Sequence, residues 1–388
     1  MPVAENTNYR GRQILIGFQK DLVGNVLSKA IDLSAFAEEV TITDNFNMRE
    51  INPVNNNGQN AGSVVGDAVF EGNLNLNTAR ALSPMFMAAI IGKAPAFTFG
   101  PKVASSWVTA TAHMQGDVVK LTTGEYLIAQ NNGTTGATEP VITTETDWDN
   151  LALDGTVLWK LRTTLYEAGD YETNFCTEKM VIIERNAEGC GGVNVFDRIL
   201  EGVELTYYAV QKDDGVIVST QNIPFMAIKE RRSSEPGFQD ITVTSVIKPR
   251  EDYFTAENVL IRVDGQKYGT LLNFMLEYTR NVTMRTSTEP NERIVVVDKP
   301  TFTGSGTIKL DPAEYELLRK ISTKSITISM NGYDGETVNI TVPKTQFINP
   351  TINKEGSREF WMDFTLNPTG NLDNAMAKVD ITTAINFN

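Results

Sequence analysis

Few residues in this chain could act as a nucleophile, a general base or a metal ligand. His113 is the single histidine, and Cys176 and Cys190 are the two cysteines. A serine or cysteine nucleophile needs an adjacent base, so any triad of that kind would have to use His113. One histidine and two cysteines cannot complete the four-ligand set of a structural zinc site, and two cysteines cannot make a disulfide scaffold. We therefore expect neither enzymatic activity nor a cofactor.

Two further patterns could bind an ion, and each has a simpler interpretation. Asp147, Asp149 and Asp154 could hold calcium, but their flanks lack the dense Asp, Asn and Gly spacing of a calcium loop. We favour a solvated acidic turn. Residues 189–192, Gly-Cys-Gly-Gly, lie between two predicted strands and do not open a helix. That context is typical of a hairpin turn and not of a phosphate loop.

Aromatic residues gather between positions 101 and 163, which hold three of the four tryptophans. If these side chains are exposed, they could stack against sugar rings. If they are buried, they form the core that a module of about 60 residues needs. For Trp107 and Trp159 we favour the core. Tyr126 and Trp148 are the expected exposed pair, and therefore the candidates for a glycan contact.

Charge and composition exclude several classes of protein. The 388 residues carry 34 basic and 48 acidic side chains, a formal net charge of −14, which repels phosphate and argues against nucleic-acid binding. Abundant Gly, Asn and Thr with short alternating apolar runs favour strands and turns. The first 12 residues are polar and unlike a secretory signal, and the apolar run at 85–91 is too short to span a bilayer, so we expect a product made in a cytoplasm.

The chain contains an internal repeat, and a repeat determines the architecture. Residues 64–76 and 296–308 both read as a strand, a glycine and more strand. Other matches occur in the same order: 13–16 with 258–261, Ser83-Pro84 with Asp311-Pro312, 179–183 with 324–328, and 211–215 with 353–356. Within the first match Phe70 aligns with Phe302, Gly72 with Gly304 and Leu76 with Ile308. Each X-Pro pair is a helix-start signal, so each copy should carry one helix.

The repeat sets the expected domains. The first copy covers residues 1–100 and 164–229, residues 101–163 are an inserted module, 230–250 are a polar linker, and the second copy covers 251–388. The second copy crosses the insertion point with almost no residues, so the ends of the module should lie close together at an exposed loop. Loops at 52–62 and 287–291 occupy one repeat position, and the first is too long for a simple hairpin.

The order of elements in these two copies resembles the tail tube proteins of long-tailed, siphovirus-type phages. The resemblance implies a mainly β chain of two tandem β-sandwich or barrel domains, each with a flanking helix. It also implies a structural role: stacked rings form the conduit for DNA delivery, with three duplicated chains supplying six barrels per ring. Expected partners are further copies of the chain in ring and ring-to-ring contacts, other tail proteins and DNA that passes without specific binding; no membrane is expected. The loops at 52–62 and 287–291 are expected to make the ring-to-ring contacts. The expected location is the virion tail, assembled in the host cytoplasm.

The inserted module resembles small carbohydrate-binding-type β modules. The resemblance is carried by Trp107, Gly116-Asp117-Val118-Val119, Glu125-Tyr126, 133–136, Glu139-Pro140 and 154–159. It implies a unit that projects from the outer tube surface and is dispensable for assembly. An alternative function follows: a virion or secreted β protein that recognises surface glycans through residues 101–163.

Overall fold

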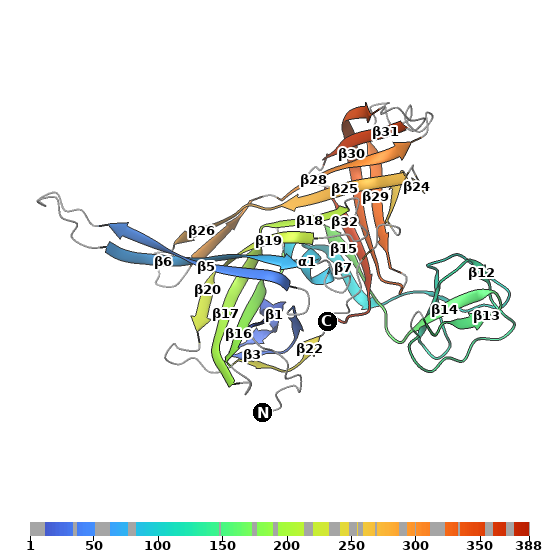
Figure 1. Ribbon diagram of the computed structural model, residues 1–388, viewed down its shortest axis with the longest axis horizontal. Coiled ribbons are helices and arrows are strands. Elements are labelled where there is room, and N and C mark those ends of the chain that lie inside the picture. The colour runs from blue at the N-terminus through green and yellow to red at the C-terminus, as the bar shows by residue number, and fades with distance from the viewer. Residues whose placement is uncertain are drawn as a thin grey trace, which may run out of the picture.

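The computed structural model describes residues 12–33, 37–50, 63–76, 83–146, 149–172, 177–188, 193–212, 220–232, 241–247, 254, 259–267, 270–286, 293–298, 300–310, 323–332, 334–353, 360–369 and 376–387. The described chain is mainly β and forms several sheets (Figure 1). Its helical elements are α1 (Ser83–Ile90) and the short 3-10 turn η1 (Gln19–Asp21). The helix expected from Asp311-Pro312 and the loops at 52–62 and 287–291 lie outside the described residues. No described helix has the length and apolar character needed to cross a membrane.

The first large sheet is built by the first part of the chain. Its order is β22 (Val246–Ile247), β4 (Ala30–Asp32), β1 (Arg12–Phe18), β16 (Met180–Glu188), β17 (Val193–Leu205), β19 (Thr220–Ala227), β6 (Ser63–Leu76) and β5 (Ala37–Glu50), with β20 (Lys229–Arg232) paired to β17. A small sheet of β2 (Leu22–Val23), β3 (Val26–Leu27) and β21 (Thr242–Val243) lies beside it. The region 241–247, expected as linker, therefore contains strands β21 and β22, which pair with β3 and β4 of the first copy.

The second large sheet is built mainly by the second part of the chain. Its order is β18 (Tyr207–Lys212), β25 (Thr270–Thr279), β28 (Thr301–Leu310), β31 (Phe360–Pro368), β30 (Thr337–Asn353), β29 (Lys324–Asn331), β23 (Val259–Val263) and β24 (Gln266–Lys267). From β30 it continues through β32 (Lys378–Thr383) and β15 (Tyr166–Glu172) to β7 (Lys93–Pro101). Three strands expected in the first copy, β7, β15 and β18, thus pair within the second sheet.

The two large sheets share one order of strands. The first contains β1-β16-β17-β19-β6-β5 and the second contains β23-β29-β30-β31-β28-β25, with every neighbouring pair antiparallel. This is the order in which the sequence repeat aligns the corresponding segments. In both sheets a glycine allows close packing: a phenylalanine ring from the neighbouring strand lies over Gly72 (Phe225) and over Gly306 (Phe364).

Strand pairing corrects the sequence alignment at one point. Ile16 pairs with Ile182, and Ile261, which aligns with Ile16, pairs with Ile328. Aligning Lys179 with Lys324 matched Ile183 to Ile328 and is wrong by one residue. The reason is the period of two in a strand: Ile182 faces the main core, whereas Ile183 faces a separate cluster on the other side of the sheet.

One hydrophobic core extends across both sheets. It contains Ile16 and Phe225 from the first sheet and Leu276 and Phe364 from the second. The helix α1 is buried in the same core from Met85 to its end at Ile90, as expected for a helix that is apolar on all sides. Its Phe86 ring stacks on Tyr208, with 6.2 Å between ring centroids. The two sheets are therefore held by a common core and do not pack as separate bodies.

Two hairpins extend from the sheets toward the same side of the molecule, at the left of Figure 1. One is β5–β6, in which each strand has 14 residues, and the other is β26 (Val282–Thr286) with β27 (Arg293–Val297). In the sequence, the loops at 52–62 and 287–291 lie between the two strands of each hairpin.

The inserted segment forms its own small β module, at the right of Figure 1. A five-stranded sheet has the order β13 (Ala152–Asp154), β14 (Val157–Arg162), β11 (Tyr126–Ala129), β10 (Val118–Lys120) and β8 (Ser105–Ser106). Two further strands, β9 (Ala112–His113) and β12 (Gly133–Thr134), form a separate antiparallel pair. The module has its own core around Trp159.

Candidate functional site

His113 is part of the packing of the module. Its Nδ1 lies 3.5 Å from an Asp117 carboxylate oxygen, and its ring meets Trp159 edge to face at 5.2 Å between centroids. Within the described part of the chain, no group of three or more His, Cys, Asp or Glu side chains is placed to hold a metal ion. Cys176 and Cys190 lie outside the described residues.

Asp154 joins the two indoles of the module. Its Oδ2 accepts hydrogen bonds from Trp107 Nε1 at 2.9 Å and Trp159 Nε1 at 3.3 Å, and its Oδ1 accepts one from the Gly136 backbone at 2.8 Å. Trp159 is fully buried and Trp107 packs on the same cluster. The prediction that both tryptophans form the core is confirmed. Asp154 is a buried structural acceptor, since a buried carboxylate requires such donors; Asp147 lies outside the described residues.

Tyr126 is buried, so the expectation that it is exposed was wrong. Only 3% of the residue is accessible, and its hydroxyl donates to the Lys102 carbonyl at 3.0 Å. Lys120 Nζ lies 5.5 Å from the ring centroid, and burial raises the pKa of the Tyr126 hydroxyl. The alternation of side chains along β11 could not predict the burial of Tyr126, because both faces of this strand are covered and all four of its residues are buried. A sugar ring cannot stack on this side chain, and Trp148, the other candidate, lies outside the described residues.

The two ends of the module meet, as the sequence predicted. β7 leads into the module and β15 leaves it, and these strands pair with Pro101 opposite Tyr166. The Lys102 backbone N–H also donates to the Leu165 carbonyl at 2.9 Å. An insertion whose ends are neighbours in a sheet leaves the pairing of the host strands intact.

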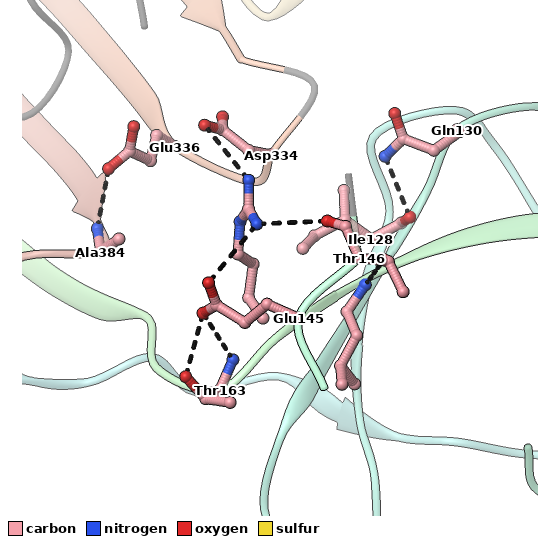
Figure 2. A network of polar contacts seen from close by, with 10 residues as sticks. Ile128, Gln130, Glu145, Thr146, Thr163, Asp334, Glu336 and Ala384 are labelled. Atoms are coloured by element: carbon pink, nitrogen blue, oxygen red, sulfur yellow. Dashed lines mark hydrogen bonds and ion pairs between the residues drawn. The ribbon is translucent and has the colours of Figure 1, made fainter. Parts of the chain in front are cut away.

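A polar network fixes the module against the second half of the chain (Figure 2). The side chain of Arg162, at the end of β14, is 8% exposed. Its Nη2 lies 3.9 Å from Asp334 Oδ2, and its Nη1 lies 3.8 Å from Glu145 Oε2. Glu145 also accepts hydrogen bonds from the backbone and hydroxyl of Thr163, at 3.2 and 3.0 Å. Asp334 belongs to the turn that precedes β30 and is 1% exposed. The guanidinium thus lies between a module carboxylate and a carboxylate of the second copy.

Apolar contact accompanies this network. Gly335, next to Asp334, has a φ of +85°, and an added Cβ would come within 2.9 Å of Ile128 and 3.2 Å of Leu165. The neighbouring Glu336 accepts a hydrogen bond from the Ala384 backbone at 2.9 Å and ties the turn to the C-terminal segment. The module is therefore docked on the body at a defined position and is not simply tethered by its two ends.

The two sheets are joined by β18. This strand continues from β17 after Thr206, lies beside β19 and pairs antiparallel with β25, from Tyr207 opposite Thr279 to Lys212 opposite Phe274. The order β5-β6-β19-β18-β25-β28-β31-β30 is thus one run of strands across both copies. The Tyr207 hydroxyl also donates to Glu277 at 2.9 Å, and burial, followed by this contact, raises the pKa of Tyr207 to about 12.

A buried ion pair strengthens the joint. Arg280, directly after β25, is 1% exposed, and its Nη2 donates to Glu204 Oε2 at 3.0 Å. Its other contacts reach the Thr177 hydroxyl, the Ala89 carbonyl at 3.4 Å and, through its backbone N–H, the Thr206 carbonyl at 2.8 Å. One side chain of the second copy thereby binds three segments of the first. Burial raises the pKa of Glu204, and Arg280 opposes that shift.

The face of this run that is turned away from the core is mainly polar, although Met226 and Met275 also lie on it. Core residues alternate with Thr, Ser, Asn and acidic side chains: Thr41, Thr43, Glu71, Asn73, Asn75, Asn273, Glu277, Thr303, Ser305, Thr307, Asp363 and Thr365. Lys309 is a basic residue on the same face, opposite Trp361. Trp361 is partly exposed while Met362 and Phe364 are in the core, so the tryptophan lies on the face of β31 that is turned away from the core. Such a face offers no basic cluster for phosphates among its described side chains.

Comparison with known proteins finds no family that matches the chain and no curated protein similar to it.

Proposed function

We propose that the chain is the tail tube subunit of a long-tailed bacteriophage. The observation that carries the proposal is the shared strand order of the two large sheets together with the β18–β25 joint. A duplicated domain whose copies merge into one run of strands is suited to form part of a closed wall. Each copy would be a tandem tube domain, with α1 as the flanking helix of the first and residues after Asp311-Pro312 as that of the second.

The polar face supports a role as a conduit. In the proposed tube the face turned away from the core lines the lumen, where DNA passes. Acidic side chains such as Glu71, Glu277 and Asp363 do not bind phosphates, so DNA would slide without being held. Hydroxyl and amide side chains would keep this surface hydrated. The proposed location is accordingly the virion tail, after assembly in the host cytoplasm.

Three chains per ring are expected from the duplication. Closed rings have point-group symmetry, and three chains with two tube domains each give six similar positions. Negative-stain images of the purified protein should show stacked rings, and native mass measurement of short assemblies should give multiples of three chains. Discrete monomers at assembly concentrations would count against a tube, and rings of six chains would contradict the role of the duplication.

The module is expected to project outward and to be dispensable for assembly. A unit of about 60 residues would obstruct a lumen that admits duplex DNA, and its ends meet in the β7–β15 pair, so that pair persists without it. Replacing residues 103–162 with a short Gly-Ser linker should leave tubes of the same diameter but with a smoother outer surface in electron micrographs. Arg162→Met is the matched control, which keeps the module and removes its ion pairs with Asp334 and Glu145. Loss of tubes only in the shortened chain would place the module in the wall.

Glycan recognition by the module has less support. The burial of Tyr126 removes one of the two proposed contacts, and Trp107 and Trp159 are used in the core. A glycan array probed with assembled tubes, with the shortened chain as control, tests whether the module binds glycans. Repetition along a tube would amplify a weak contact by avidity.

A further inference from the structure

An apolar surface of fixed shape lies exposed on the module, along the segment 108–114. Every second residue of this segment is apolar and exposed, from the 53% exposed Val108 to the 73% exposed Met114: Val108, Ala110, Ala112 and Met114. Thr135 holds the segment in place, because its hydroxyl donates to the Val108 carbonyl at 2.6 Å and accepts from the Thr111 backbone N–H at 2.8 Å. We call these four side chains the apolar strip. Exposed apolar surface of this kind marks a contact site for another protein.

A second exposed apolar surface lies on the small sheet of β2, β3 and β21, which we call the flap. The inner side of the flap is buried, since Leu27 packs in a cluster with Leu15 of β1. On the outer side Val23 pairs directly with Val26, and these two valines are 76% and 42% exposed. The pair is thus open to a partner in the single chain.

The flap lies on the outer side of the proposed tube. Ile16 of β1 and Phe225 of β19 belong to one core, so β1 and β19 lie on opposite sides of it. The flap covers the far side of β1, whereas the far side of β19 belongs to the mainly polar face that is proposed to line the lumen. The flap valines therefore point away from the lumen, on the side to which the module is proposed to project.

The module extends from the molecule on the side opposite the two hairpins (Figure 1). In a stack of rings whose hairpins point to one neighbouring ring, the modules point to the other. Figure 1 shows the module well separated from β3, so the apolar strip does not meet the flap of its own chain. The flap that it can reach belongs to a second copy of the chain.

Charge favours a contact between these two surfaces. Residues 101–163 carry 4 basic and 7 acidic side chains, a net charge of −3, and two of the basic ones, Lys160 and Arg162, are buried. The surroundings of the flap carry one more basic than acidic side chain: Lys20, Lys29, Lys229 and Arg231 against Asp21, Glu178 and Glu201. Opposite net charges around an apolar contact select the partner and speed its association.

We propose that the apolar strip of the module packs on the flap valines of a second copy of this chain in the adjacent ring. The inference rests on the proposed tube function and gives the module a role in it, as a brace between rings on the outside of the tube. Met114 suits the contact because its flexible side chain adapts to an irregular surface. Each contact is small and gains strength by repetition along the tube. The chain without the module should still form tubes, but at a higher protein concentration.

Cross-linking in assembled tubes tests the contact. In full-length chains with Cys176→Ser and Cys190→Ser, we would introduce Met114→Cys together with Val26→Cys, assemble tubes and add a short bis-maleimide. Each chain then offers one strip and one flap, so bonding from ring to ring continues along the tube. Denaturing gels should show a ladder of dimers, trimers and longer products. Parents with only one of the two introduced cysteines should give no such ladder.

Val141→Cys together with Val26→Cys is the matched control. Val141 is 93% exposed, but it lies at another end of the module: the nearby Glu139 accepts a hydrogen bond from Thr122, after β10, whereas Met114 precedes β10. No ladder is expected from this pair. Normal tubes in which the Met114 pair gives no ladder, or in which the Val141 pair gives an equal one, would overturn the contact and leave the tube function standing.

A second measurement does not depend on cross-linking. Met114→Gln and Val26→Thr should each raise the protein concentration at which tubes form by about tenfold, because each removes one apolar side chain from the contact. The double variant should be little worse than either single one, since the two residues act in the same contact. Unchanged tube formation in both single variants contradicts the proposal, and loss of glycan binding in Met114→Gln would then assign the strip to glycans. A chain that forms no tubes even without substitutions would overturn the tube function and the contact together.

Discussion

Replacing Arg280 with methionine should lower the free energy of unfolding by about 3–5 kcal/mol, among the largest effects expected for any single substitution in this chain. Methionine fills much of the same volume, so packing changes little. The loss comes from Glu204, which would stay buried without the cation that now lies 3.0 Å away. Urea unfolding followed by far-UV circular dichroism measures the change.

Two comparisons separate the charge from the packing. Arg280→Met combined with Glu204→Leu should recover a substantial part of the lost stability, because a buried ion pair can be replaced by apolar residues of similar volume. If the double variant is as unstable as the single one, the other contacts of Arg280, with Thr177 and Ala89, are the important ones.

The loss of stability in Arg280→Met should depend on pH. Burial raises the pKa of Glu204 above its ordinary value of 4.5, so the folded state binds this proton more tightly than the unfolded chain. Stability contributed by this group therefore increases as pH falls from neutral toward 4.5. Removing Arg280 raises the pKa further, and the stability difference between Arg280→Met and the native chain should shrink as the pH is lowered from 8 to 5.

Gly72→Ala should destabilise the chain by about 3 kcal/mol, although it adds a single methyl group. An ideal Cβ at Gly72 would lie 2.2 Å from the Thr41 carbonyl oxygen and 2.5 Å from the Phe225 ring. The first obstacle is backbone, so β5 and β6 would have to separate or Phe225 would have to leave the core. Thermal unfolding and the tube yield both report this change.

Gly100→Ala is the control for that substitution. Gly100 lies in β7 and an added Cβ would meet no atom within 4 Å, so a change of less than about 0.5 kcal/mol is expected. Gly306→Ala should behave like Gly72→Ala, since its Cβ would lie 2.6 Å from the Asn273 carbonyl oxygen and 2.9 Å from the Phe364 ring. Tolerance of alanine at Gly72 and Gly306 would show that close packing at these glycines is not required.

Local sequence patterns were sufficient for several features of this protein. Strand alternation and the matched glycines predicted two copies with corresponding strands, and the interruption of one copy predicted a module whose ends meet. The need of a small domain for large apolar side chains predicted that Trp107 and Trp159 belong to the core of the module, where Trp159 is fully buried and Trp107 packs against the same cluster. Each of these inferences depends on residues close together in the chain or on a pattern that occurs twice.

Contacts between distant segments could be known only once the chain had folded. β18 follows β17 in the first copy but pairs with β25, because the edge of the second sheet offers an unpaired strand there. Tyr126 is buried beside Leu165 and donates a hydrogen bond to the Lys102 carbonyl, and Arg280 pairs with Glu204, 76 residues away in the sequence. The periodicity of apolar residues along a segment does not show which surfaces meet, because strand pairing and burial depend on the edges and faces that other elements leave open.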